Sequence, residues 1–202
     1  MLLEVKQISC SRNYRSLFND LSFNIESGQL LLVEGKNGCG KSTLLRILSG
    51  LRQPDTGTIH WNNSEIKQAS KHYSQQLVWL GHRNGINESL TAKENLQIAA
   101  SFIKSKVSNI GYILKRVGLK PYANTPVRQF SAGMKRRLAL ARLLLNNAIL
   151  WILDEPQSAL DKTGIALLEG MIEQHVRNGG MVIMSSHHDI NFKSIPLGRL
   201  AL

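Results

Sequence analysis

One eight-residue segment has the composition of a phosphate-binding loop. It matches the pattern G-x-x-x-x-G-K-[ST] and consists of Gly35, Lys36, Asn37, Gly38, Cys39, Gly40, Lys41 and Ser42. Glycines allow the backbone to curl until successive N–H groups face one anion. Lys41 would then reach the β- and γ-phosphates of a nucleotide, and the Ser42 hydroxyl would bind Mg²⁺. We therefore predict a nucleotide-binding loop that extends to Thr43; the alternative is a glycine-rich turn without a ligand.

Two adjacent carboxylates end an apolar run later in the chain. Asp154 and Glu155 follow the run Leu150-Trp151-Ile152-Leu153. Alone, such a pair is also typical of a strand end that meets solvent. Beside a phosphate-binding loop, Asp154 would hold Mg²⁺ through its water shell, and Glu155 would orient and deprotonate an attacking water. Lys41 and Glu155 are therefore predicted catalytic residues for hydrolysis of the bound nucleotide.

The apolar periodicity predicts the elements that position these groups. The run at 30–33 indicates a buried strand before the loop, and residues 44–48 indicate a helix after it that ends at Gly50. Further strands are predicted at 2–8, 21–25, 58–61, 77–80, 149–153 and 181–184. Further helices are predicted over 92–118, with a break near Ser108 and Asn109, and over 132–145 and 163–176. This alternation predicts an α/β fold with a largely parallel sheet and a helical middle.

Composition excludes several classes of protein. The 202 residues are 43% hydrophobic and 19% charged, which is typical of a globular chain and not of a disordered one. No segment approaches the roughly 20 clean apolar residues that span a bilayer. The alternating start, 1–6, lacks the pattern of a secretion signal. The two cysteines, Cys10 and Cys39, are too few for a disulfide framework and fit a reducing cytosol.

Positive charge is concentrated in one part of the chain. The net charge is +11, and ten of the 25 Lys and Arg residues fall within 101–150. They are Lys104, Lys106, Lys115, Arg116, Lys120, Arg128, Lys135, Arg136, Arg137 and Arg142. No acidic residue occurs between Glu94 and Asp154. Such a cluster suits a phosphate backbone, a triphosphate, acidic loops of a partner or anionic lipid, and it is also compatible with a solvated face.

A family resemblance rests on the segment that starts this basic helix. Phe130-Ser131-Ala132-Gly133-Met134 resembles the L-S-G-G-Q signature of ABC ATPases and departs from it at Phe130, Ala132 and Met134. Ser131 and Gly133 keep the positions that present a hydroxyl and backbone N–H groups to phosphate. Ser131 is equally a good helix N-cap. The order of the phosphate loop, this segment and the acidic strand end strengthens the resemblance.

Other family elements follow in the expected order. Residues 158–161 resemble the D-loop, and His187 resembles the catalytic switch histidine that contacts the γ-phosphate, the alternative being a surface histidine. His82 stands where the family has a glutamine that reaches Mg²⁺, and a neutral imidazole can also bind a metal. The position of the base-stacking aromatic has Tyr14 as its candidate, although the spacing suits Arg12 as well.

The resemblance implies a complete set of expectations about fold and assembly. These are an α/β P-loop NTPase fold of ABC type with a RecA-like core, an antiparallel β-subdomain and an inserted helical subdomain. A single domain, 1–202, would have its core and β-subdomain at about 1–85 and 148–202 and its helical subdomain at about 86–147. ATP and Mg²⁺ are the implied cofactors. Two copies would pair head to tail, so that Ser131 of one copy completes the site of the other.

Several local segments resemble one subfamily, the ATP-binding export subunits of cytochrome c biogenesis. The segments are 80–82, 90–96, 126–133, 151–156 and 179–183. This implies an ATPase on the cytoplasmic side of the bacterial inner membrane, bound to the integral membrane subunits of the haem exporter. Its hydrolysis would be linked to release of a haem-loaded chaperone, with no direct nucleic-acid contact. The alternatives are a generic ABC importer or exporter ATPase and a nucleic-acid-associated ATPase.

Overall fold

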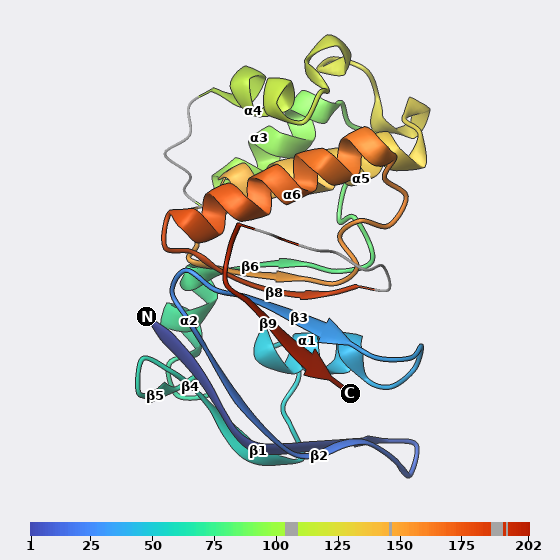
Figure 1. Cartoon of the computed structure of the whole chain (residues 1–202). Helices are drawn as coiled ribbons and strands as arrows, with labels where there is room; N and C mark the ends of the chain where they lie inside the picture. The colour runs from blue at the N-terminus through green and yellow to red at the C-terminus, as the bar shows by residue number, and fades with distance from the viewer. Residues whose placement is uncertain (104–108, 146, 187–191, 193) are drawn as a thin grey trace. The chain divides into compact units, whose positions relative to one another are not determined.

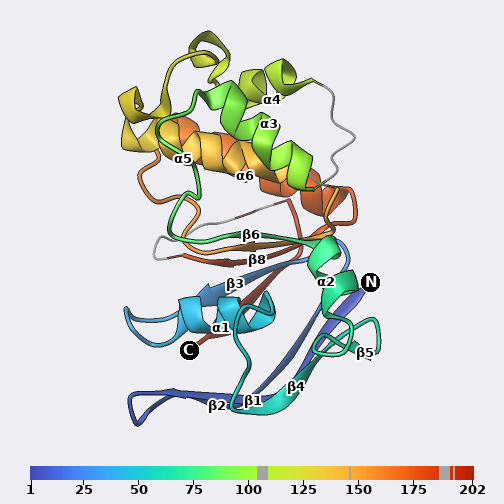
Figure 2. The same ribbon diagram turned by 180° about the vertical axis from the view of Figure 1, so that it is seen from behind.

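The computed structural model describes residues 1–103, 109–145, 147–186, 192 and 194–202 (Figure 1, Figure 2). The chain forms two compact units. The first contains Met1–Trp79, Ala148–Glu155 and Ile172–Leu202, and the second contains Leu80–Asn147 and Pro156–Met171. The helical subdomain predicted at 86–147 lies within the range of the second unit, and the assignment of subdomains remains a prediction.

Five strands form one sheet in the order β6-β7-β8-β3-β9. They are β3 (Leu30–Glu34), β6 (Leu77–Leu80), β7 (Leu150–Leu153), β8 (Met181–Ser185) and β9 (Leu197–Ala201). β3 runs parallel to β8 and β9, and β7 runs parallel to β8. β7 and β8 are buried along their whole length, which explains their continuous apolar sequences. The predicted α/β fold with a parallel sheet is confirmed.

A second, antiparallel sheet belongs to the first unit. Its order is β2-β1-β4-β5, with β1 (Leu2–Arg12), β2 (Arg15–Glu26), β4 (Thr56–Trp61) and β5 (Ser64–Glu65). Asn13 and Tyr14 form the two-residue turn between β1 and β2, and both have positive φ, 51° and 59°. Such a turn matches the twist of the strands it joins. Tyr14 is therefore carried at the tip of the hairpin, where it is fully exposed.

The first unit also contains two helices, α1 and α2. α1 (Lys41–Leu48) follows β3 and the glycine-rich loop, and all but two of its residues are buried. α2 (Ser70–Gln76) was not predicted, because only Tyr73 among its seven residues is buried and no apolar period marks it. The Tyr73 hydroxyl donates to the Leu48 carbonyl at 2.5 Å, which links α2 to the end of α1. β5 and β9 were missed for a similar reason, since neither is continuously buried.

The second unit is helical, as expected for the middle of the chain. It contains α3 (Ala92–Phe102), α4 (Ile110–Arg116), α5 (Ala132–Ala141) and the short 3-10 helices η1 (Lys120–Tyr122), η2 (Val127–Gln129) and η3 (Arg142–Leu145). Thr91 and Glu94 form a reciprocal capping box at the start of α3. The predicted helix 132–145 changes to 3-10 geometry at Arg142. α6 (Lys162–Arg177) begins in this unit and ends in the first.

No helix within the described ranges is long and apolar enough to cross a membrane.

One stacked pair links the end of α6 to β7 of the parallel sheet. The rings of Trp151 and His175 lie 3.9 Å apart and are inclined by only 7°. His175 Nε2 lies 3.0 Å from the Ile149 carbonyl oxygen. Burial lowers the pKa of His175, and its contacts with the backbone of Ile149 and Met181 oppose this shift in part. The fold therefore favours a neutral imidazole.

We predict a pH-dependent contribution of His175 to stability. Because its folded pKa lies below the ordinary 6.5, the unfolded chain binds the proton more readily. This contribution is fully present above pH 6.5 and is lost as pH falls toward the folded pKa. His175→Phe keeps a ring on Trp151 and removes the titration, so its urea-unfolding free energy should fall less between about pH 7 and about pH 5 than that of the parent chain. An identical acid-side loss in both proteins would contradict this.

Candidate functional site

The glycine-rich loop between β3 and α1 needs backbone that only glycine adopts easily. Gly35 has φ of 148°, and a Cβ there would lie 2.6 Å from Cys39 Sγ. Gly40, the N-cap of α1, has φ of 117°, and a Cβ there would lie 3.1 Å from Leu17 Cβ. Cys39 N donates to the Lys36 carbonyl at 3.2 Å and closes the loop. The curl predicted from the glycine spacing is therefore present.

Lys41 holds the loop together from inside. Its ammonium donates to the carbonyls of Gly35 at 2.6 Å and Lys36 at 3.1 Å, and only 6% of the residue is exposed. The charge is thus fixed at the curl, where α1 also begins. A helix N-terminus attracts anions because its first N–H groups are unpaired and its dipole is positive there. Loop, lysine and helix end together can bind a phosphate chain.

The carboxylate of Asp154 joins the loop to two strand ends. Its Oδ1 accepts hydrogen bonds from Ser42 Oγ at 3.0 Å and Ser185 Oγ at 2.9 Å, and Asp154 is only 2% exposed. Ser185 Oγ in turn accepts from the Glu155 N–H at 3.0 Å. Ser185 was missed in the sequence, although it follows Met184, the partner of Leu153 in the β7–β8 register. Parallel strands end at one edge, which is the signal that could have found it.

The donor atoms around Asp154 fit a small hard cation. Mg²⁺ prefers oxygen ligands and usually binds through one or two protein groups, waters and substrate phosphates. The Ser42 hydroxyl and the Asp154 carboxylate supply two such oxygens within 3.0 Å of each other. Among the described residues, no group of three or more His, Cys, Asp and Glu side chains forms a self-sufficient metal cage. This donor set suits a metal that arrives with a nucleotide.

A pocket of about 220 Å³ lies against the loop. Its lining combines loop residues with Glu155 and consists of Arg12, Leu17, Asn37, Gly38, Gly40, Lys41, Ser42, Thr43 and Glu155. Glu155 has φ of 47°, so the chain turns sharply after the buried Asp154 and Glu155 lines the pocket. Arg12, at the end of β1, is also part of the lining. Tyr14 is not among the lining residues.

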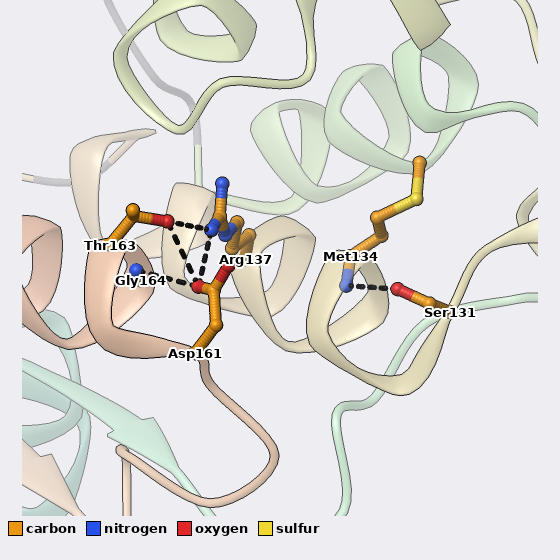
Figure 3. Close-up of polar contacts among 6 residues, drawn as sticks. All are labelled: Ser131, Met134, Arg137, Asp161, Thr163 and Gly164. Atoms are coloured by element: carbon orange, nitrogen blue, oxygen red, sulfur yellow. Dashed lines mark hydrogen bonds and ion pairs between the residues drawn. The ribbon is translucent and has the colours of Figure 1, made fainter.

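The predicted signature residues lie in the second unit. Ser131 caps α5, where its Oγ accepts from the Met134 N–H at 3.2 Å (Figure 3). Gly133 approaches the Ala159 carbonyl so closely that a Cβ would lie 3.0 Å from that oxygen. His82 is exposed, between Gly81 and Arg83. His187 lies outside the described residues, so its predicted contact stays a prediction.

The basic cluster is partly used for internal contacts of the second unit. Arg137 donates to Asp161 Oδ1 at 2.5 Å (Figure 3), and Lys135 pairs with Glu88 at 2.8 Å. Arg142 donates to the carbonyls of Asn84 and Gly85, and its burial lowers its pKa. Arg136 is buried as well. Carboxylates therefore offset the charge of Lys135 and Arg137, whereas Arg136 and Arg142 bind neutral acceptors and keep their charge within the unit.

Comparison with known proteins gives one consistent result. The family model described as "ABC transporter" matches residues 18–158. The Cytochrome c biogenesis ATP-binding export proteins CcmA of Vibrio vulnificus (strain YJ016) and Yersinia pseudotuberculosis are each 44% identical to the whole chain, over 99% and 93% of their own lengths. An ABC transporter ATP-binding protein of Pyrococcus furiosus superposes with a TM-score of 0.85 at 25% identity, over 99% of this chain and 98% of its own.

The pocket lining leads to a prediction about the base-binding residue. Arg12 can stack its guanidinium plane on a purine, and loss of such an interaction costs about 1 kcal/mol, or several-fold in affinity. We expect Arg12→Ala to weaken ATP binding by about that factor, while Tyr14→Ala changes it by less than about twofold. Titration with a fluorescent ATP analogue measures both. The reverse ranking of the two variants would contradict this expectation and identify Tyr14 as the stacking residue.

Proposed function

We infer the role of this chain from one premise, which is that it belongs to the ABC transporter family. It is an ABC-type ATPase that binds nucleotide and hydrolyses ATP. We propose that it is the ATP-hydrolysing subunit of a cytochrome c biogenesis export system that handles haem. Identity of 44% over the whole chain to relatives named for that system carries this proposal.

The residues of the first unit support a specific division of labour in hydrolysis. Lys41 would neutralise the β- and γ-phosphates from the curl of the loop, and Ser42 and Asp154 would hold Mg²⁺. When bound, Mg²⁺ supplies positive charge that stabilises the phosphates during transfer. Glu155, which lines the pocket, would accept a proton from the attacking water. The observation that supports this assignment is the Ser42–Asp154 hydrogen bond, since it brings loop and acidic pair together.

The second unit would act on the nucleotide of another copy. Ser131 and Gly133 resemble residues that contact phosphate across an ABC dimer, and a chain with one set of motifs needs a second copy to supply them. We propose ATP-driven closure of two copies head to tail, hydrolysis, and reopening after phosphate leaves. His187 would contact the γ-phosphate, and His82 would take the place of the usual glutamine near Mg²⁺. The closed dimer would pass its movement to integral membrane subunits at the cytoplasmic side of the inner membrane.

Replacement of Glu155 by Gln separates binding from chemistry. The amide keeps the size and cannot accept the proton of the attacking water, so we expect ATP turnover to fall by at least about 100-fold. ATP-dependent dimerisation should persist. Phosphate release and size-exclusion chromatography with ATP measure the two properties. Glu26→Gln, an exposed carboxylate of β2, is the matched control and should turn over ATP like the parent. Full turnover by Glu155→Gln would refute the assignment.

Co-purification tests the biological system. A tagged chain isolated from detergent-solubilised membranes should retain integral membrane subunits of cytochrome c maturation. A strain without this chain should lose holo-cytochromes c, and the parent chain should restore them while Glu155→Gln does not. A different permease in the pull-down, together with unchanged cytochrome c content, would instead assign the chain to a generic ABC transporter.

A further inference from the structure

The segment after Glu155 is fastened to the signature helix α5 at three points. Arg136 Nε donates to the Pro156 carbonyl at 2.9 Å. Gly133 lies against the Ala159 carbonyl, where a Cβ would be 3.0 Å from the oxygen, closer than an ordinary contact. Arg137 bonds to Asp161, whose Oδ1 also accepts from the Gly164 N–H at 2.8 Å (Figure 3). Little more than one turn of α5, from Gly133 to Arg137, thus contacts this segment at residues 156, 159 and 161.

The contact made by Arg136 differs from the other two, because Arg136 also binds a third segment, residues 81–84. Its second nitrogen, Nη1, donates to the Gly81 carbonyl at 3.1 Å and to Asn84 Oδ1 at 3.2 Å. The residue is only 2% exposed. Burial of a guanidinium costs desolvation energy, which hydrogen bonds to its donors must offset. The planar guanidinium also fixes the directions of several acceptors at once. Lysine carries its donors on one atom and lacks the rigid plane that spaces the guanidinium donors.

The backbone at Glu155 needs support from outside. A φ of 47° is uncommon for a residue with a side chain. The following residue is Pro156, and proline pushes the residue before it toward extended conformations. Unfavourable backbone of this kind persists only where neighbouring contacts determine it. Two hydrogen bonds flank the strained residue: Ser185 Oγ accepts from the Glu155 N–H, and Arg136 donates to the Pro156 carbonyl.

We propose that Arg136 is a positioning residue for the hydrolytic step, a role that rests on the proposed function of Glu155. By fixing the Pro156 carbonyl, it keeps Glu155 in the turned conformation in which this residue lines the pocket. Through Gly81 and Asn84, the same guanidinium ties this conformation to the segment that carries His82. The signature helix, the His82 segment and the residue that follows Glu155 therefore share one buried cation. Arg136 itself touches neither phosphate nor water in this role.

A double-mutant cycle with Glu155 tests the proposal. Arg136→Lys keeps the buried charge and loses the fork, so we expect kcat for ATP to fall about 10-fold or more with KM changed less than about threefold. In the Glu155→Gln background, where the group it positions is already gone, the same substitution should lower the residual single-turnover rate by less than about twofold. A merely structural role would lower both rates by the same factor.

Controls separate the possible failures. Arg142→Lys disturbs the contacts to the Asn84 and Gly85 carbonyls, and any loss it causes should be equal in both backgrounds. Equal losses for Arg136→Lys would overturn the proposal. Full activity of Glu155→Gln alone would refute the proposed function instead, which keeps the two results distinct. If Arg136→Lys does not fold, as judged by its melting curve, Arg136→Gln leaves no buried charge unpaired and is measured in the same cycle.

Discussion

The carboxylate of Asp154 is the point on which the site depends. Asp154 is only 2% exposed. Its Oδ1 accepts hydrogen bonds from Ser42 at the start of α1 and from Ser185 at the end of β8. A buried carboxylate without such donors would be costly. With them, the ends of β7 and β8 and the phosphate-binding loop are held in one arrangement. The parallel sheet therefore does more than form a core, because the carboxyl ends of β7 and β8 fix the loop that lines the pocket.

Most strands and the phosphate-binding loop of the first unit could be predicted from the sequence. Fewer of the tertiary contacts could be predicted. Continuous apolar runs identified β3, β7 and β8, and glycine spacing identified the loop, because burial and backbone geometry restrict residue type at those places. α2 escaped prediction because its polar sequence buries only Tyr73. Ser185 and Arg136 act through tertiary contacts, which no local spacing records. The sequence likewise does not show that Arg12 lines the pocket while Tyr14 lies exposed at the hairpin tip, and which of the two stacks on a base stays a prediction.

The charge of the helical segment has a different meaning once contacts are known. A run of cations in sequence suggests a surface for an anionic partner. Arg136, Arg137 and Arg142 instead donate to carbonyl and carboxylate groups of their own unit. No acidic residue occurs from 95 to 153, and backbone carbonyls of Pro156, Gly81, Asn84 and Gly85 act as acceptors for Arg136 and Arg142. The positive charge of this segment is offset by carboxylates at Lys135 and Arg137, while the guanidinium of Arg136 is used inside the unit.

The bonds of Lys41 have a consequence for how nucleotide affinity arises. Its ammonium spans the Gly35 and Lys36 carbonyls, so the curvature of the loop is held by the chain's own atoms. When a phosphate enters the loop, the Lys41 ammonium would exchange these carbonyl acceptors for phosphate oxygens. Because the loop is already curved, binding would cost it little conformational entropy. Preorganisation of this kind makes association less costly. A substitution at Lys41 therefore removes two hydrogen bonds that hold the loop as well as the positive charge of the ammonium. Nucleotide affinities measured on such variants combine both losses.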